Sequence, residues 1–210
     1  MTVSINKPRR GRPPKSHSNE HDTRTALIRS GLEQLTESGF AASGIDGILK
    51  KVGVPKGSFY HYFASKEAFG MAVLDSYATY FAKKLDLFLL DESHSPLERV
   101  RNFVIDAQQG MAKHEFKRGC LVGNLGQEVD LLPESFRQPL IQVFSNWQQK
   151  LAQCFYAAQH NGELAASAQC DALAEYFWIG WEGAVSRAKL VKSSAPLESF
   201  YSQFMMSLPK

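Results

Sequence analysis

The chain has 210 residues, of which 44% are hydrophobic and 21% charged, and its formal net charge is +3 at pH 7. This composition is typical of a globular protein with one fairly large domain or a small domain joined to a medium one. Because no apolar run approaches roughly 18 residues and none follows the basic N-terminus, we expect neither a membrane span nor a signal peptide. Cysteines are few and far apart (Cys120, Cys154 and Cys170), which argues against a disulfide scaffold and indicates the reducing cytoplasm.

Positive charge is concentrated in the first third of the chain. Residues 1–66 hold eleven Lys and Arg against five Asp and Glu, whereas residues 67–210 hold thirteen against sixteen. A basic first third beside a mildly acidic remainder predicts a polyanionic partner for the first third. Charge alone leaves open the alternative that this is a chance excess of solvated basic residues with no partner.

The first part of the chain predicts a polar arm followed by short helices. Residues 1–20 combine prolines with basic residues and are expected to be a disordered arm. Apolar residues at helical spacing then predict a helix from Asp22 that ends at Gly39. The next helix is expected from Ser43 to Val52, with Ser43 and Asp46 forming a capping box. A short helix is expected over Lys56 to Phe63. A long helix is then expected from a Ser65 cap to about Leu90.

The remaining residues predict longer helices. Ser95-Pro96-Leu97-Glu98 is a strong helix start, with a Ser cap, Pro at the first position and Glu at the third. We expect a short helix after Cys120, long helices from Pro133 to Gly162 and from Cys170 to Val191, and a last helix from Pro196. No alternating strand pattern or repeat is present. The sequence therefore predicts an all-α fold of about nine helices, divided into an arm (1–20), a DNA-binding domain (21–66) and a ligand-binding and dimerisation domain (67–210).

Two of the short helices are joined by Gly53-Val54-Pro55, a connection typical of a helix-turn-helix. The second helix would enter the major groove with Lys56 and Gly57 at its start, where backbone N–H groups also favour a phosphate. Four aromatic residues within five positions cannot all face DNA, so we expect Phe59 and Phe63 to face the core; an entirely structural aromatic cluster is the alternative. The candidate DNA contacts are Ser43, Lys56, Gly57, Ser58, Tyr60, His61, Tyr62 and Lys66.

The run GIDGILKKVGVPKGSFYHYFASKE, from Gly44 to Glu67, resembles the DNA-binding domain of the TetR family of repressors. The resemblance covers residues 22–67 closely, and helix count and length are similar over the rest. It implies a homodimer of all-helical subunits that binds a double-stranded DNA operator and carries a variable ligand-binding body. It also implies DNA contacts from Lys56, Gly57, Tyr60, His61, Tyr62 and Lys66. Asp46 departs from the family pattern, where a basic or neutral residue is common, and we expect it to cap its helix.

The arm adds a second candidate DNA-binding element. Arg10-Gly11-Arg12-Pro13, flanked by Arg9 and Lys15, resembles an AT-hook core. Arginine side chains suit a narrow A/T-rich minor groove, where the negative potential is deepest. A basic tail with non-specific phosphate contacts is the equally weighted alternative, and either version raises the salt sensitivity of binding.

Two stretches of the body are candidates for sensing a signal. Residues 118–128 combine a cysteine and amides with several glycines, and residues 178–184 set a carboxylate among large aromatic side chains. Both resemble the branch of the TetR family that responds to acrylate and to electrophiles, in which the cysteine matching Cys120 lies at the ligand-sensing region and Lys189 also matches a lysine. The candidate ligand-sensing residues are Cys120, Asn124, Gln127, Trp178, Trp181, Glu182 and Lys189.

Cys120 is expected near a helix start, after Lys117 and Arg118, where these positive charges and Lys189 would favour its thiolate. We therefore expect it to react with, or lie against, a small electrophile such as an unsaturated aldehyde or an acrylate-like acid. A small buried apolar thiol is the first alternative. The second is a carboxylate ligand held without a covalent bond by Lys189, Arg187 or Asn124. Glu182 would repel such a ligand unless it is itself paired, and Arg187 and Lys189 are both candidates for that pairing.

In either mode the ligand would shift the population of two arrangements of the body, and the fourth helix would tilt the DNA-binding domains out of register. The last two helices are expected to form the dimer interface, because Phe200, Tyr201, Phe204 and Met205 give the final helix a large apolar face. The same face could pack only within its own subunit, and the two interpretations are compatible.

The sequence does not predict an enzyme. No glycine-rich phosphate loop is present, the six histidines have no metal-ligand spacing, and a dyad of Cys120 with His114 lacks an orienting group, so neither cofactor nor metal is expected. An architectural DNA-binding protein without a ligand is a further alternative. The large body with its Cys- and Trp-containing stretches argues against it.

Overall fold

The computed structural model describes the backbone of residues 17–210 and the side chains of residues 22–210. This part of the chain is helical throughout and has no strand, which confirms the predicted fold class. The predicted arm, with Arg10 and Arg12, lies outside the described residues. The elements are α1 (His17–Ser38), α2 (Ile45–Val52), α3 (Lys56–Tyr62), α4 (Lys66–Leu89), α5 (Pro96–Lys113), α6 (Leu121–Gln127), the 3-10 helix η1 (Glu134–Phe136), α7 (Arg137–His160), α8 (Cys170–Val191) and α9 (Ala195–Ser207).

Local sequence explains most helix ends. The hydroxyl of Ser65 accepts a hydrogen bond of 3.0 Å from the Ala68 backbone N–H and so caps α4. At the start of α5 the Ser95 backbone N–H donates to the Glu98 carboxylate at 3.0 Å, as a capping box predicts. Gly53 ends α2 with a φ of 72°, a left-handed conformation that favours glycine.

The start of α2 differs from the prediction. Its N-cap is Gly44, and no side chain caps the helix. The Ser43 hydroxyl donates instead to the Gly39 carbonyl, and Asp46 pairs with Lys56. The expected capping box of Ser43 and Asp46 is therefore wrong, because the tight turn that follows α1 takes up the hydroxyl.

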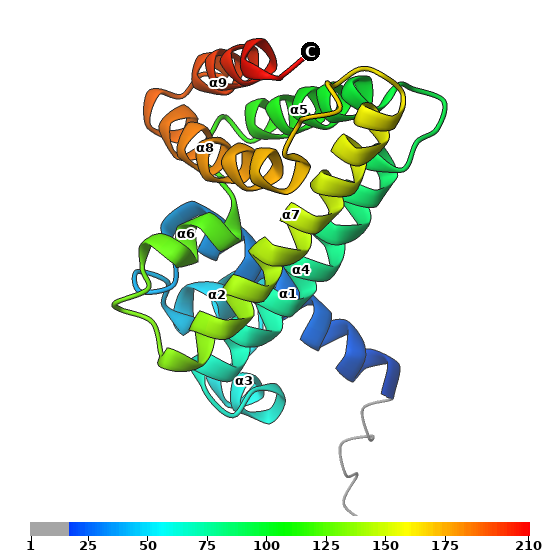
Figure 1. Cartoon of the computed structure of the whole chain (residues 1–210). Coiled ribbons are helices and arrows are strands. Elements are labelled where there is room, and N and C mark those ends of the chain that lie inside the picture. The colour runs from blue at the N-terminus through cyan, green and yellow to red at the C-terminus, as the bar shows by residue number, and fades with distance from the viewer. Residues whose placement is uncertain (1–16) are drawn as a thin grey trace, which may run out of the picture.

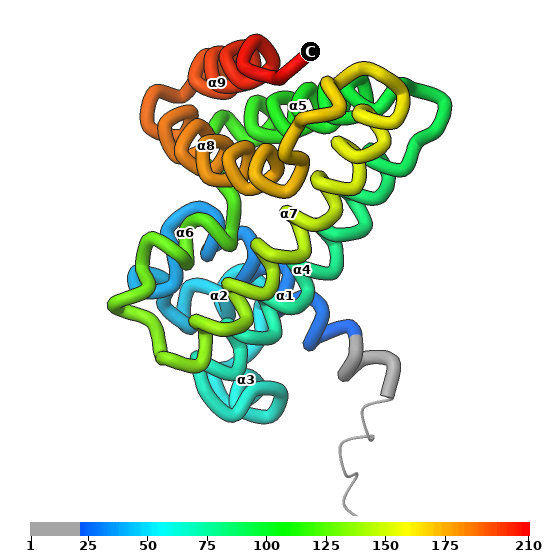
Figure 2. Tube along the Cα trace, viewed as in Figure 1, coloured from blue at the N-terminus to red at the C-terminus, as the bar shows by residue number. Residues whose placement is uncertain are grey.

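The helices form two units that α4 joins (Figure 1). The N-terminal unit, defined as α1, α2, α3 and the first turns of α4, is followed by a body built from the rest of α4 and from α5 to α9. Within the body α7 packs against α4, α5 and α8, and α9 packs on α8. The path in Figure 2 shows α6 beside the N-terminal unit, and α6 contacts α1, α4 and α7. A change in the body can therefore reach the N-terminal unit by two routes, α4 and α6.

Aromatic residues form much of the core of each unit. Phe59, Phe63 and Phe69 contact one another in the N-terminal unit, with ring centroids 5.0–5.5 Å apart. In the body, Trp147 and Trp178 lie 5.0 Å apart and are buried. Such packed rings restrain side-chain rotation and give both units a rigid interior.

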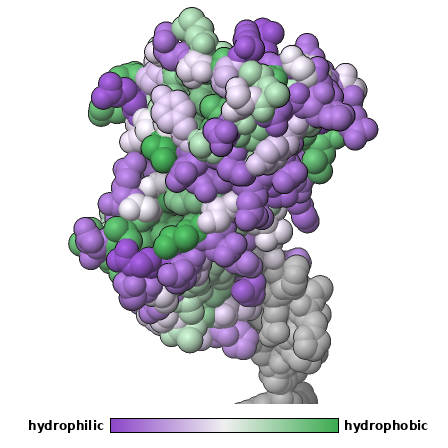
Figure 3. Space-filling view, viewed as in Figure 1, coloured by the Kyte–Doolittle hydropathy of each residue, from purple (hydrophilic) through white to green (hydrophobic). Residues whose placement is uncertain are grey.

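The face in Figure 3 is largely hydrophilic, with apolar patches at the level of the segment after α6. Leu131, which is 71% exposed, belongs to this segment. None of the described helices is long and apolar enough to cross a membrane.

Candidate DNA-binding and ligand-sensing sites

Helix α3 presents one polar face to solvent and one aromatic face to the core. Tyr60 is 53% exposed, and Lys56, Gly57 and His61 are also exposed. Phe59 is fully buried and Phe63 is 4% exposed, as expected from their positions. The remaining candidates, Ser58 and Tyr62, are half-buried. The helix thus offers its N-terminal end and its Tyr60 face to a partner, while its phenylalanines hold it in place.

An ion pair joins the starts of α2 and α3. The Lys56 Nζ lies 3.1 Å from the Asp46 Oδ1, and both side chains are well exposed. Exposed pairs of this kind are weak, because water screens them. The lysine is therefore free to exchange its carboxylate partner for a DNA phosphate.

Two of the predicted DNA contacts are turned inward. Ser43 is 1% exposed, with its hydroxyl bound to the Gly39 carbonyl. The Lys66 Nζ donates to the Phe40 carbonyl at 2.7 Å and lies 4.5 Å from the centre of the Phe40 ring, and burial lowers its pKa. In this conformation both side chains stabilise the turn between α1 and α2, and a contact of either with DNA stays a prediction.

A cavity of about 260 Å³ lies in the body next to the end of α1. Its aromatic walls come from α4, α5 and α8, and the segment 114–120 and Thr36 of α1 close it toward the N-terminal unit. A larger groove of about 510 Å³ runs between α4 and α7. The residues used below that line the smaller cavity are Thr36, Tyr77, Phe81, Lys84, Phe103, His114, Arg118, Cys120, Trp181 and Glu182.

Cys120 is the N-cap of α6 and is 8% exposed. Its Sγ accepts hydrogen bonds from the Gly123 backbone N–H at 3.4 Å and from the Tyr77 hydroxyl at 3.6 Å. Burial, followed by the nearby Glu182 charge, raises the pKa of the Cys120 thiol well above its usual value. The predicted position at a helix start is confirmed, but in this conformation the surroundings of Cys120 favour the neutral thiol over the predicted thiolate.

The positive charges expected near Cys120 have other partners. Lys117 pairs with Glu115, and Arg118 pairs with Glu33 and Glu37 of α1. Lys189 donates to backbone carbonyls of α1. None of these groups is therefore left to lower the pKa of the thiol.

Glu182 extends from α8 toward the start of α6. A Cβ placed on Gly123 would lie 2.0 Å from the Glu182 Oε2, so the carboxylate rests directly against the α6 backbone. Burial raises the pKa of Glu182 to about 7, and its hydrogen bond with Cys120 partly offsets this rise. The predicted pairing with Arg187 or Lys189 is wrong, because Lys189 binds α1 and Arg187 is exposed.

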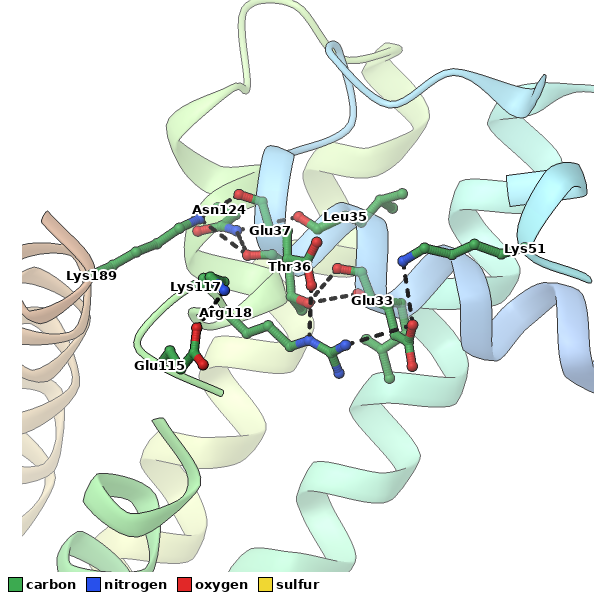
Figure 4. A network of polar contacts seen from close by, with 11 residues as sticks. Glu33, Leu35, Thr36, Glu37, Lys51, Glu115, Lys117, Arg118, Asn124 and Lys189 are labelled. Carbon is green, nitrogen blue, oxygen red and sulfur yellow. Dashed lines mark hydrogen bonds and ion pairs between the residues drawn. The ribbon is translucent and has the colours of Figure 1, made fainter. Parts of the chain in front are cut away.

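Three side chains of the body, Arg118, Asn124 and Lys189, bind the C-terminal end of α1, and we call them the α1 anchor (Figure 4). Asn124 Nδ2 donates to the Thr36 carbonyl at 2.9 Å and to the Leu35 carbonyl at 3.3 Å. Lys189 Nζ donates to the Thr36 carbonyl at 3.1 Å and to the Glu37 carbonyl at 2.8 Å. The last carbonyls of a helix lack partners within it and carry partial negative charge, so these donors stabilise the end of α1.

The structure divides the predicted sensing residues among three places. Cys120, Trp181 and Glu182 line the cavity. Asn124 and Lys189 belong to the α1 anchor, and Gln127 is exposed. Trp178 is buried behind the cavity wall, and its ring N–H has no hydrogen-bond partner among the described residues.

Sequence reasoning missed several cavity residues. Tyr77 and Phe81 line it from α4, Phe103 from α5, and Thr36 from α1. The spacing of Tyr77, Phe81 and Lys84 places these three residues on one face of α4. That spacing is the sequence signal that could have identified the α4 residues of the cavity. Nothing near Thr36 in the sequence marks it as part of a site.

The apolar face expected on α9 is partly internal. Phe204 is 1% exposed and contacts Phe177, and Phe200 packs against Gly180 of α8. The exposed apolar side chains of the last two helices are instead Tyr176, Ile179, Leu190, Val191 and Met206. The prediction that Phe204 faces a second subunit is therefore wrong. Among residues 22–210, no group of His, Cys, Asp and Glu could hold a metal ion.

Comparisons with known proteins match both units. The family model "Bacterial regulatory proteins, tetR family" matches residues 27–72, and "Tetracyclin repressor-like, C-terminal domain" matches residues 96–204. The transcriptional regulator AcuR of Cereibacter sphaeroides is 54% identical over 198 residues, which cover 94% of this chain and 90% of AcuR. The transcriptional repressor NemR of Escherichia coli is 32% identical over 180 residues, which cover 86% of this chain and 90% of NemR.

Solved structures agree. The regulatory protein TetR from Rhodobacter sphaeroides superposes with a TM-score of 0.87 at 54% identity, over 89% of this chain and 98% of that one. Reduced NemR of E. coli gives a TM-score of 0.80 at 31% identity, over 88% of this chain and 95% of that one. These relatives support the AcuR/NemR branch of the family, and they are named as transcriptional regulators rather than as enzymes. With both domains matched, the chain belongs to the TetR family of transcription repressors.

Proposed function

We propose that this chain binds an operator as a homodimer in the cytoplasm and leaves it when a small electrophile or acrylate-like acid occupies the cavity at Cys120. The observation that carries the proposal is the contact of this cavity with α1. Thr36 lines the cavity, and its carbonyl accepts hydrogen bonds from Asn124 and Lys189. A ligand that moves the cavity wall would disturb the α1 anchor and, through it, the position of α3.

The exposed face of α3 supports the DNA-binding half of the proposal. Its start, at Lys56 and Gly57, supplies a cation and free backbone N–H groups, and Tyr60 and His61 supply further donors on the exposed surface. Ser58 and Tyr62 complete this surface, whereas Ser43 and Lys66 are withdrawn from it. The arm at Arg10 and Arg12 would add contacts to the minor groove or to phosphates.

The exposed apolar side chains of α8 support a homodimer. Tyr176, Ile179, Gly183 and Leu190 fall on one stripe of α8 at helical spacing, and Ile179 is 66% and Leu190 80% exposed. In a two-fold symmetric dimer, the α8 stripe of each subunit would pack against the same stripe of the other subunit. Two N-terminal units would then meet successive major grooves about 34 Å apart.

The cavity itself supports a small ligand. Its volume of about 260 Å³ and its aromatic walls suit a compact molecule with a short conjugated chain. The thiol of Cys120 provides a site for addition to an activated alkene, and Arg118, Lys84 and His114 provide positive or hydrogen-bonding groups for a carboxylate. A covalent and a non-covalent ligand would act by the same shift between two arrangements of the body.

The experiment is a titration of operator binding by fluorescence anisotropy, with and without acrolein or acrylate. We expect either compound to weaken binding by about 5- to 150-fold, the usual range for coupling between two sites. In Cys120→Ser, the response to acrolein is expected to disappear if the ligand is covalent, whereas the response to acrylate is retained if it is non-covalent. If neither compound alters operator affinity or melting temperature, the chain acts as an architectural DNA-binding protein and the proposal fails.

A further inference from the structure

Cys120 belongs to a cluster of three proton-bearing groups from three elements. The Tyr77 hydroxyl of α4 donates to the Cys120 Sγ at 3.6 Å, and the Glu182 carboxylate of α8 lies against Gly123 and lines the same cavity as the thiol. The Gly123 backbone N–H also donates to the sulfur, at 3.4 Å. Glu182 is the carboxylate beside this thiol, whereas the Tyr77 hydroxyl and the Gly123 N–H act as donors to the sulfur.

Gly123 makes this contact possible. A Cβ at this position would lie 2.0 Å from the Glu182 Oε2 and 3.6 Å from the Cys120 Cβ. Any larger residue would push the carboxylate away from the sulfur. Gly126, one turn further along α6, is a natural comparison, because a Cβ there would meet nothing within 4 Å.

The cations that line the cavity have partners other than Glu182. Lys84 of α4 pairs with Asp106 of α5, and Arg118 pairs with Glu33 and Glu37 of α1. The remaining titratable groups on the cavity wall are Tyr77, Tyr80, His114 and Cys120. Burial raises the pKa of Glu182 to about 7, and a carboxylate with a raised pKa is a stronger base than an ordinary one.

We propose that Glu182 is the base that accepts the proton of Cys120 when the thiol adds to a small activated alkene in the cavity. This inference rests on the proposed function, since it names the chemistry by which the same cavity detects its ligand. It explains how a buried, neutral thiol becomes reactive without any positive charge to stabilise a free thiolate.

The reaction is an addition of S–H across C=C, and its atoms and electrons balance. A sulfur electron pair forms the bond to the β-carbon of an α,β-unsaturated carbonyl compound, and the S–H proton passes to Glu182. The π electrons of the alkene move toward the carbonyl and give an enolate. Glu182 then returns the proton to the α-carbon, so the carboxylate is regenerated and no oxidant or reductant is consumed.

The opposite expectation follows if Glu182 acts only through its charge. A carboxylate beside a thiol disfavours the thiolate, so removing that charge would speed alkylation of Cys120. The two roles therefore predict changes of opposite sign for the isosteric substitution Glu182→Gln.

The test measures the rate of Cys120 alkylation by acrylamide, a small neutral activated alkene, by peptide mass spectrometry across a pH series. In the wild type we expect the rate to rise with a midpoint near the Glu182 pKa of about 7. Glu182→Gln is expected to lose this midpoint and to react about a hundredfold more slowly at neutral pH. An equal or faster rate in Glu182→Gln, with a melting curve that shows a folded protein, overturns the inference.

Two further variants separate the base from its surroundings. Gly123→Ala keeps the carboxylate but displaces it, so it should also slow alkylation, whereas Gly126→Ala should react as the wild type does. His114→Gln controls for the imidazole on the same cavity wall, because histidine is the side chain that most often serves as a general base. Loss of the midpoint in His114→Gln, with its retention in Glu182→Gln, would assign the base to His114 and overturn the inference.

Operator binding in the same samples distinguishes the two proposals. If acrylamide alkylates Cys120 at the expected rates but operator affinity is unchanged, the base assignment stands and the release mechanism fails. If acrylate releases the operator but Cys120 is never alkylated in the wild type, the repressor function stands and the base assignment fails.

Discussion

Lys56, the first residue of α3, has two competing partners. In the free protein its ammonium group lies 3.1 Å from the Asp46 carboxylate. On an operator the same group would face a phosphate, and the acid beside it would repel that phosphate. We therefore expect Asp46 to modulate the strength and salt dependence of DNA binding without contacting a base.

Substitution of this pair should change operator affinity in opposite directions. Asp46→Asn should raise affinity severalfold, because it removes a negative charge near the DNA backbone and releases Lys56. Lys56→Ala should lower affinity and reduce the slope of log affinity against log salt by about 1. Anisotropy titrations at several salt concentrations measure both effects. Glu92→Gln, an exposed acid beyond the opposite end of α4, is the control and should alter neither.

The raised pKa of Glu182 also makes stability depend on pH. The pKa is about 7 in the folded protein against 4.5 for the model carboxyl group. Below pH 4.5 the carboxyl group is protonated in both the folded and the unfolded protein, and its contribution to the free energy of unfolding is complete. Between pH 4.5 and about 7 the folded protein binds more protons than the unfolded one, so stability falls as the pH rises. The loss is at most about 3 kcal/mol and is complete above the folded pKa.

Melting temperatures of wild type and Glu182→Gln at pH values below and above this window check the expectation. The wild type should lose stability relative to Glu182→Gln as the pH is raised. Parallel pH dependence in the two proteins would mean that the pKa of Glu182 is not raised in the folded protein.

At the scale of elements, α6 links the cavity to α1. Its N-cap is Cys120, its second turn carries Asn124, and its last residue, Gln127, reaches solvent. The sequence analysis assigned all three residues to one ligand-sensing site. Cys120 is separated from the other two because its backbone is extended and lies outside the helix. Gln127 is separated because it is the last residue of the helix and its side chain is exposed.

The α1 anchor gives a test at this scale. Lys189→Met keeps a long side chain but removes the donor to the Thr36 and Glu37 carbonyls. We expect a lower melting temperature, because charge-assisted hydrogen bonds to a helix end are worth roughly 1–3 kcal/mol. We also expect a smaller effect of ligand on operator affinity, because α8 is no longer tied to α1. Lys83→Met, which removes an exposed lysine of α4, should change neither quantity.

Helix boundaries followed from local sequence far better than contacts did. Ser65, Ser95 and Gly53 end or begin their helices as expected, because capping involves residues only a few positions apart. The charge state of Cys120 did not follow, since its nearest lysine and arginine are neutralised by acids that include Glu37, 81 residues from Arg118. Long-range pairing of this kind leaves no local pattern in a single sequence.

At the scale of the whole molecule, the proposed homodimer would bind DNA only if its two subunits hold their N-terminal units at the right separation. The apolar stripe on α8 lies in the body, and α4 carries the N-terminal unit at its other end. A small change of angle along α4, which has 24 residues, becomes a displacement of several ångströms at α3 because the helix is about 36 Å long. Association and operator binding should therefore weaken together.

Ile179→Glu tests this dependence, because it places a charge in the centre of the exposed stripe of α8. We expect mostly monomers in sedimentation velocity, and operator affinity at least tenfold weaker. Leu87→Glu changes a similarly exposed leucine of α4, which is 71% exposed, and should remain dimeric. A monomeric wild type, or a dimeric Ile179→Glu with unchanged affinity, would contradict the assignment of the interface.

All three tryptophans of the chain lie in the body, and none lies in the N-terminal unit. Trp181 lines the cavity, while Trp147 and Trp178 lie behind it with ring centroids 5.0 Å apart and their rings tilted by 40°. Excitation energy passes readily between indoles this close. A molecule that quenches the fluorescence of Trp181 therefore also lowers the fluorescence of Trp147 and Trp178. The unlabelled protein should therefore report arrival of its ligand by fluorescence, and stopped-flow mixing with dye-labelled operator would time that arrival against the departure of DNA.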